Sequence, residues 1–168
     1  MIPFVENSNI TAAVMPLDLD TDRTGDYVNV ANCQRMGVLA VISPGTAGDD
    51  PTFTLNQATT AAGGSTKVAT VITAYWTKQA ATDLTSTGTW TKSTQTAAST
   101  VAGNATSAEQ AKMYYFEVDP ATLDVANGFD WISVDVALAA SGGAQYGTII
   151  YIPIGGKYPQ ATVPSIIA

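Results

Sequence analysis

Apolar and polar residues alternate along many short stretches of this chain, and helical periodicity is nearly absent. The longest alternation runs from Trp131 to Leu138, with Ile132, Val134 and Val136 at every second position. A period of two is typical of a β-strand with one buried face. We therefore expect these three residues to form the centre of the core.

Further strands are expected wherever Val, Ile, Tyr and Thr gather between clusters of Gly, Pro and Asp. Within them, Phe53 and Leu55 should point inward, and Val68, Thr70, Ile72 and Ala74 should share one face. A short helix or tight loop is expected over residues 119–128, and a capping-box pattern predicts one helical turn at Thr106–Glu109. The expected strands span residues 26–32, 36–42, 52–57, 67–76, 88–95 (an edge strand), 113–118, 131–138 and 146–152.

Turn signals recur at a spacing that favours an all-β fold, a two-sheet antiparallel β-sandwich with a jelly-roll-like arrangement and extended N- and C-terminal segments. We expect an N-terminal arm over residues 1–16, the sandwich over residues 17–152 and a C-terminal tail over residues 153–168. Prolines 153, 159 and 164 should hold the tail out of any central strand, because proline cannot donate to a ladder.

Composition narrows the possible functions. The chain has 168 residues, 46% hydrophobic and 12% charged, which suits one domain with a real core and a surface of uncharged polar groups. It has no histidine and a single cysteine, Cys33, which we expect to be a small buried thiol suited to a reducing cytosol. The sequence therefore predicts no enzyme, no cofactor and no metal site.

A net charge of −7 argues against nucleic acid as a partner, because nucleic-acid binding draws on Lys and Arg. No apolar stretch approaches the length that spans a bilayer, and the N-terminus lacks the basic start of a secretory signal. We expect neither a membrane partner nor a leader peptide.

Carboxylates are the remaining source of chemistry. Asp18, Asp20 and Asp22 alternate as in a calcium loop, but Arg23 stands where that loop needs glycine, so a solvated loop or polar strand face is favoured. Asp49 and Asp50 precede a proline and are interpreted as turn residues. A glycosidase pair among the later carboxylates is not singled out by any spacing; its members would come from Asp124, Asp130 and Asp135.

Aromatic residues offer one binding hypothesis. Trp76, Trp90, Trp131 and Tyr75 could form a sugar-stacking platform, although the alternation around Trp131 favours a place in the core. Trp90 stands among Thr and Ser on an expected edge strand, where an indole tends to mark an interface.

Both ends of the chain carry apolar residues on segments broken by proline. Such ends either fold back on their own domain or dock on a neighbouring subunit. The interface residues expected there are Ile2, Pro3, Phe4 and Val5 at one end and Val163, Pro164, Ile166 and Ile167 at the other.

Four segments together resemble a known family: GDYVNVANCQRMGVLAVI (25–42), GDDPTFTLNQATTAAG (48–63), TSAEQAKMYYFEVDPATLDVANGFDWISVDVA (106–137) and GTIIYIPIGGKYPQATVPSIIA (147–168). Their order is similar to that in capsid decoration, or cement, proteins of tailed bacteriophages. The resemblance implies a non-enzymatic virion protein made in the host cytoplasm. It would sit on the capsid exterior, bind the major capsid protein and associate with itself as a homotrimer. It carries over no catalytic or cofactor residue.

The residues leave alternatives open. A phage tail or neck component belongs to the same interaction class, and a carbohydrate-binding β-sandwich module belongs to another. An enzyme would need a carboxylate pair that the sequence does not single out.

Overall fold

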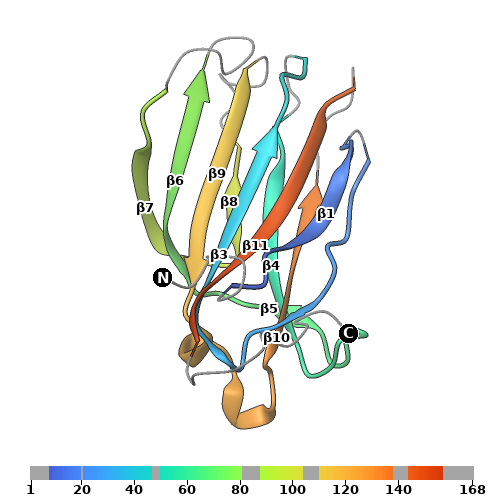
Figure 1. Cartoon of the computed structure of the whole chain (residues 1–168), viewed down its shortest axis with the longest axis vertical. Helices are drawn as coiled ribbons and strands as arrows, with labels where there is room; N and C mark the ends of the chain where they lie inside the picture. Colours follow the sequence, from blue (N-terminus) through green and yellow to red (C-terminus); the bar gives the residue numbers. More distant parts are fainter. Residues whose placement is uncertain are drawn as a thin grey trace.

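A computed structural model describes residues 8–19, 21–46, 50–80, 88–103, 110–137 and 144–156, which form two antiparallel β-sheets packed face to face (Figure 1). The expected all-β sandwich is confirmed. The elements, in chain order, are β1 (Thr11–Asp18), β2 (Val28–Asn29), β3 (Cys33–Ile42), β4 (Thr52–Ala58), β5 (Lys67–Val68), β6 (Ile72–Ala80), β7 (Thr91–Ala98), β8 (Thr100–Ala102), β9 (Ala111–Val118), the 3-10 turns η1 (Pro120–Thr122) and η2 (Val125–Asn127), β10 (Trp131–Ala137) and β11 (Tyr146–Gly156).

The strand order is that of a jelly roll with one added hairpin. The first sheet, sheet A, has six strands in the order β1-β11-β3-β9-β6-β7. The second, sheet B, has five, in the order β2-β10-β4-β5, with β8 also paired to β4. Without the β6–β7 hairpin, sheet A keeps four strands, and sheet B has four strands in its main order with β8 as a fifth beside β4. The first strand then pairs the last and the second pairs the last but one, as in a jelly roll.

The core lies between the sheets and is built from alternate positions of both. On β10, Ile132 and Val134 are fully buried and Val136 is nearly so, which confirms the expected central face. Phe53 of β4 meets Tyr114 of β9 across the core, with ring centroids 5.1 Å apart. Burying such side chains is the main source of stability in a domain of this size. Other core residues are Met36, Val38, Ala40, Ile42, Leu55, Phe116, Val118, Ile149 and Tyr151, and Cys33 is buried as expected.

The N-terminal boundary was predicted too late in the chain. Residues 11–16, expected in an arm, form most of β1, which pairs with β11 from Thr11 to Asp18. Two register shifts interrupt this pairing, so the alternation that marks a strand is irregular in the sequence. Residues 1–7 lie outside the described part of the chain.

The C-terminal boundary was also wrong, because β11 runs through Pro153 to Gly156. The Pro153 carbonyl accepts a hydrogen bond from Ser8 Oγ at 3.0 Å, so it points to the β1 side of β11 and away from β3. The β1 ladder ends at the Thr11–Tyr151 pair, and a strand residue directs its N and its carbonyl to the same side. The missing proline N–H therefore costs no bond to β3. Residues 157–168, with the other two prolines, are outside the described residues.

The single strand expected over residues 67–76 is two strands in different sheets. Val68 of β5 is 53% exposed, whereas Ile72 of β6 is buried. The chain crosses between the sheets at residues 69–71, where the Ala69 N–H donates to the Leu55 carbonyl at 2.9 Å. Val68, Thr70, Ile72 and Ala74 therefore do not share a face. The alternation of residues along one segment does not show that the chain moves to the other sheet, because it holds no information about which distant strand each residue pairs with.

Other local expectations need smaller changes. The strand expected over 26–32 shrinks to β2, because the Asn29 side chain accepts the Ala31 N–H and turns the chain. The edge strand expected over 88–95 is confirmed as an edge, shifted to β7. The loop over 119–128 contains the two 3-10 turns and ends at Gly128, whose φ of 79° suits glycine. The helical turn at 106–109 and Leu138 fall outside the described residues.

Candidate docking surface

Most carboxylates of the described residues are engaged in holding loops. The Asp18 carboxylate accepts a hydrogen bond from the Gln145 backbone N–H at 3.0 Å. The backbone carbonyl of Asp18 accepts two hydrogen bonds from the Arg23 guanidinium. Asp20 and Asp49 lie outside the described residues. Within the described ranges, no three His, Cys, Asp or Glu side chains gather as a metal site would require. No helix there is long and apolar enough to cross a bilayer.

The three carboxylates considered for a glycosidase pair are held separately. Asp135 accepts the Gly25 N–H at 3.2 Å and the Asn56 amide at 2.7 Å. Asp130 accepts the Asn29 amide at 3.4 Å. Asp124 belongs to a different cluster, described next. Each carboxylate therefore has its own structural partners.

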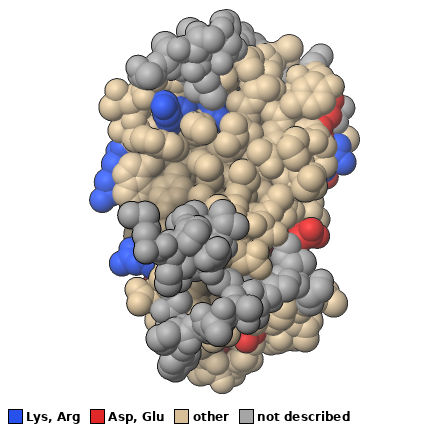
Figure 2. Space-filling view, in the orientation of Figure 1, with Lys and Arg blue, Asp and Glu red and all other residues tan. Residues whose placement is uncertain are grey.

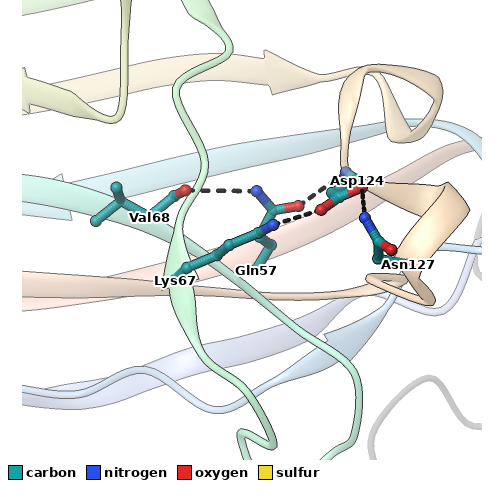
Figure 3. A network of polar contacts seen from close by, with 5 residues as sticks. All are labelled: Gln57, Lys67, Val68, Asp124 and Asn127. Carbon is teal, nitrogen blue, oxygen red and sulfur yellow. Dashed lines mark hydrogen bonds and ion pairs between the residues drawn. The ribbon is translucent and has the colours of Figure 1, made fainter.

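A polar network fixes the loop between β9 and β10 against sheet B (Figure 3). Lys67 Nζ contacts the Asp124 carboxylate, and the Asn127 amide donates to the same carboxylate at 2.8 Å. Gln57 accepts the Asp124 N–H at 2.9 Å and donates to the Val68 carbonyl at 3.4 Å. The hydrogen bond from Lys67, then that from Asn127, lowers the pKa of Asp124. Because the carboxylate and the N–H of Asp124 are both already bonded, we interpret this cluster as a structural clamp that holds the loop.

The outward face of sheet A differs, because a row of mostly apolar residues crosses all six strands. Strand pairing places its members side by side, each opposite the next. At the spacing of paired strands, the row is about 24 Å long. We call it the cross-strand row: Ala12 (β1), Ile150 (β11), Leu39 (β3), Tyr115 (β9), Trp76 (β6) and Lys92 (β7).

The side chains of this row are partly exposed. The Trp76 and Tyr115 rings lie 6.0 Å apart with a tilt of 54°, and Lys92 Nζ lies 5.4 Å from the Trp76 ring. Tyr115 lies over Gly37, since a Cβ on that glycine would come within 2.8 Å of the Tyr115 hydroxyl. Val41 and Met113 occupy the next outward positions of β3 and β9, beside Leu39 and Tyr115.

Charges lie around the apolar part of this face. Arg35 pairs with Glu117 at 3.0 Å, and the Tyr115 hydroxyl donates to Glu117 at 2.9 Å. Burial, with a further contribution from Glu117, raises the pKa of Tyr115 above its usual range, so this hydroxyl stays a neutral donor. Figure 2 shows most of the blue Lys and Arg atoms along the side of β6 and β7, and a further blue group beside red atoms on the opposite side.

The predicted site residues fare differently. Trp90, predicted as an interface residue, is 43% exposed and directly precedes edge strand β7, and its interface role stays a prediction. The other eight predicted interface residues, in segments 2–5 and 163–167, lie outside the described residues.

The proposed aromatic platform does not form. Tyr75 packs against the core, whereas its neighbour Trp76 points outward from sheet A. Trp131 lies on β10 in sheet B and is only half-buried, so its expected place in the core was wrong. It alternates with Ile132, whose side chain takes the inward position.

Sequence analysis missed Leu39, Tyr115 and Ile150. The signal was present, because the segments GVLAVI and TIIYI are apolar on both faces. In a two-layer sandwich, a strand has only one inner face, so such a segment must present apolar residues outward.

No protein-family model matches this sequence, and no curated protein is significantly similar to it.

Proposed function

We propose that this protein is a non-enzymatic phage head decoration protein that docks on the outer surface of the capsid and stabilises contacts between major capsid protein subunits. The observation that carries the docking role is the cross-strand row, a line of partly exposed, mostly apolar side chains across the outward face of sheet A in an acidic protein. A contiguous apolar surface on a soluble domain commonly marks a protein-binding site. The assignment to a capsid rests on the resemblance of the four sequence segments.

The mechanism would be many copies acting together. A flat sheet face can bury a standard interface area of about 800 Å² per partner. A copy that spans two capsid subunits ties them together, and repeated copies raise the stability of the shell without any single contact being tight. The protein acts by surface complementarity and performs no bond chemistry.

The ends of the chain are the second proposed contact. Residues 1–5 and 163–168 are apolar enough that at least one end should dock on a neighbouring subunit or on a second copy, a homotrimer being the expected assembly. Deleting each segment in turn should leave the melting temperature unchanged and weaken retention on capsids. Loss of folding would assign that end to its own core, and full retention by both deletions would mean that neither end is an arm.

Cosedimentation tests the main proposal. The purified chain is mixed with empty, expanded heads that lack it, and with isolated tails from the same phage. We expect saturable binding to heads and none to tails. Binding to tails alone would support a tail or neck role, whereas binding to a glycan array without binding to heads would support a carbohydrate-binding module.

A further inference from the structure

The aromatic and cationic groups of sheet A concentrate at one corner, where β6, β7 and β9 meet. We define the corner patch as Trp76, Trp90, Tyr115, Lys78 and Lys92. Trp76 pairs with Tyr115 on one side and Lys92 on the other, and Lys78 lies opposite Met113 at the next outward position of β6. Trp90 is exposed and directly precedes β7, so it lies at the end of the strand that carries Lys92.

These two lysines differ from the other described cations. The Arg23 guanidinium donates to the Asp18 backbone carbonyl. Lys67 pairs with Asp124, Arg35 pairs with Glu117, and Lys112 is fully buried with Asp50 Oδ1 3.9 Å from its Nζ. Lys78 and Lys92, by contrast, form no ion pair within the residues that the structure describes. Lys92 instead lies near the Trp76 ring.

The patch is therefore positive on a strongly negative protein. The chain carries 14 acidic and 7 basic residues, yet Glu117 is the one carboxylate among the described outward positions of β3, β9 and β6, and Arg35 neutralises it. Two ammonium groups without an ion pair, one of them near the partly exposed Trp76 indole, fit a partner that presents carboxylates.

We infer that the corner patch recognises an acidic protein surface, and that this is the part of sheet A that engages the capsid; the inference rests on the proposed function. A protein is favoured over an acidic polysaccharide or nucleic acid because the patch continues directly into Leu39 and Ile150. Those apolar side chains need an apolar partner, which a folded protein offers beside its carboxylates and a polyanion does not.

Matched variants test the charge. Lys78→Gln with Lys92→Gln removes two positive charges, and Val68→Glu with Thr70→Glu, at exposed positions beyond sheet A, adds two negative ones, so both variants change the net charge by −2. Binding of each variant to empty heads is measured from about 0.05 to about 0.5 M NaCl. We expect the lysine variant to bind about three- to tenfold more weakly at low salt and the difference to vanish at high salt, while the control matches the parent chain.

A second pair tests the aromatic part. Trp76→Ala should weaken head binding by about thirtyfold or more, as for a central interface tryptophan, whereas Trp131→Ala on the other sheet should not. Melting temperatures confirm that each variant is folded. If Trp76→Ala fails to fold, the lysine variants, which alter only outward groups, still decide the matter.

The outcomes separate the two proposals. If the parent chain does not bind heads, the proposed function is wrong. If it binds heads and the lysine and Trp76 variants bind equally well, the proposed function stands and the corner patch is not the contact. Tighter binding of duplex DNA or alginate than of heads, lost in the lysine variant, would overturn the assignment to a protein partner.

Discussion

The outward faces of the two sheets carry different kinds of side chain, although the strands of both sheets alternate between inward and outward residues. On sheet B, the outward positions of β4 and β10 hold Asn56, Ser133 and Asp135. Asp135 binds both the Asn56 amide and the Gly25 backbone, so this carboxylate and this amide are bonded within the domain. The buried Ser133 hydroxyl forms no hydrogen bond within the described residues. On sheet A, the matching positions hold Leu39, Tyr115 and Ile150, whose apolar surfaces form no such bonds.

The edge of sheet B at β10 is also covered by the domain itself. The edge of β10 that faces away from β4 is covered by residues 23–30, which pair with it through β2 and bond to Val136 and to Asp130 just before the strand. A Cβ at Gly25 would come within 2.3 Å of the Val134 carbonyl, so only glycine allows this approach. Sheet B is thus completed within the domain, whereas the outward face of sheet A is suited to a partner.

Val134→Asp should abolish folding. Val134 is fully buried between the sheets, and an unpaired buried charge costs several kcal/mol against a total stability of about 5–15 kcal/mol. Val68→Asp, on an exposed strand of the same sheet, is the control and should fold normally. Circular dichroism and thermal unfolding check this; a soluble Val134→Asp protein that melts cooperatively would contradict the assignment of the core.

Tyr151→Phe should destabilise the domain moderately. The Tyr151 hydroxyl reaches from sheet A to the edge of sheet B, where it accepts the Val134 N–H at 2.9 Å and donates to the Asp26 carbonyl at 3.2 Å. Leaving that buried N–H unbonded costs about 1–3 kcal/mol, or roughly 2–10 °C in melting temperature. The control is Tyr27→Phe, whose hydroxyl bonds to Thr66 near the surface. Equal melting temperatures for the two variants would refute the bridging role.

The difference in melting temperature between the parent chain and Tyr151→Phe should depend on pH in alkaline solution. Burial raises the pKa of Tyr151 above its ordinary value of 10.0. Above about pH 10 the unfolded chain ionises this phenol while the folded chain keeps it neutral, so the stability that it contributes is lost as pH rises. Between about pH 9 and 11, the melting temperature should therefore fall more steeply for the parent than for Tyr151→Phe. Parallel curves would show that the phenol titrates normally.

Asp124→Asn should have a small effect that depends on pH. The pKa of Asp124 is lowered from 3.8, so its ion pair with Lys67 stabilises the fold above that value and is lost as pH falls through the lowered pKa. The variant should melt slightly below the parent near neutral pH, and the two should converge in acid. Asp26→Asn, which removes an exposed carboxylate, controls for net charge. A gap that persists in acid would argue that packing, rather than charge, is responsible.

Calcium, chelator and reductant should change nothing. The Asp18 carboxylate is already bonded to Gln145, and Cys33 is buried. Thermal unfolding with and without each additive checks this. A rise of more than about 5 °C with calcium would show that Asp18, Asp20 and Asp22 form a binding loop after all.

Much of the fold could be predicted because alternation is local. The buried faces of β4 and β10 followed directly from the placement of Phe53, Leu55, Ile132, Val134 and Val136 in the sequence, and the all-β class followed from the number of such segments. The clamp at Asp124 could not be predicted, because Gln57 and Lys67 reach it from strands far away in the chain.

By itself, then, the sequence determined that the chain forms strands, which residues of the clearest strands point inward, and that histidine and paired-cysteine chemistry is absent. Only the tertiary structure decided that residues 67–76 divide between two sheets and that Pro153 lies inside a strand. It also placed Trp76, Tyr115, Leu39 and Ile150 in one row. The physical reason is that side-chain direction depends on neighbouring residues, whereas a row across strands depends on register between segments distant in sequence.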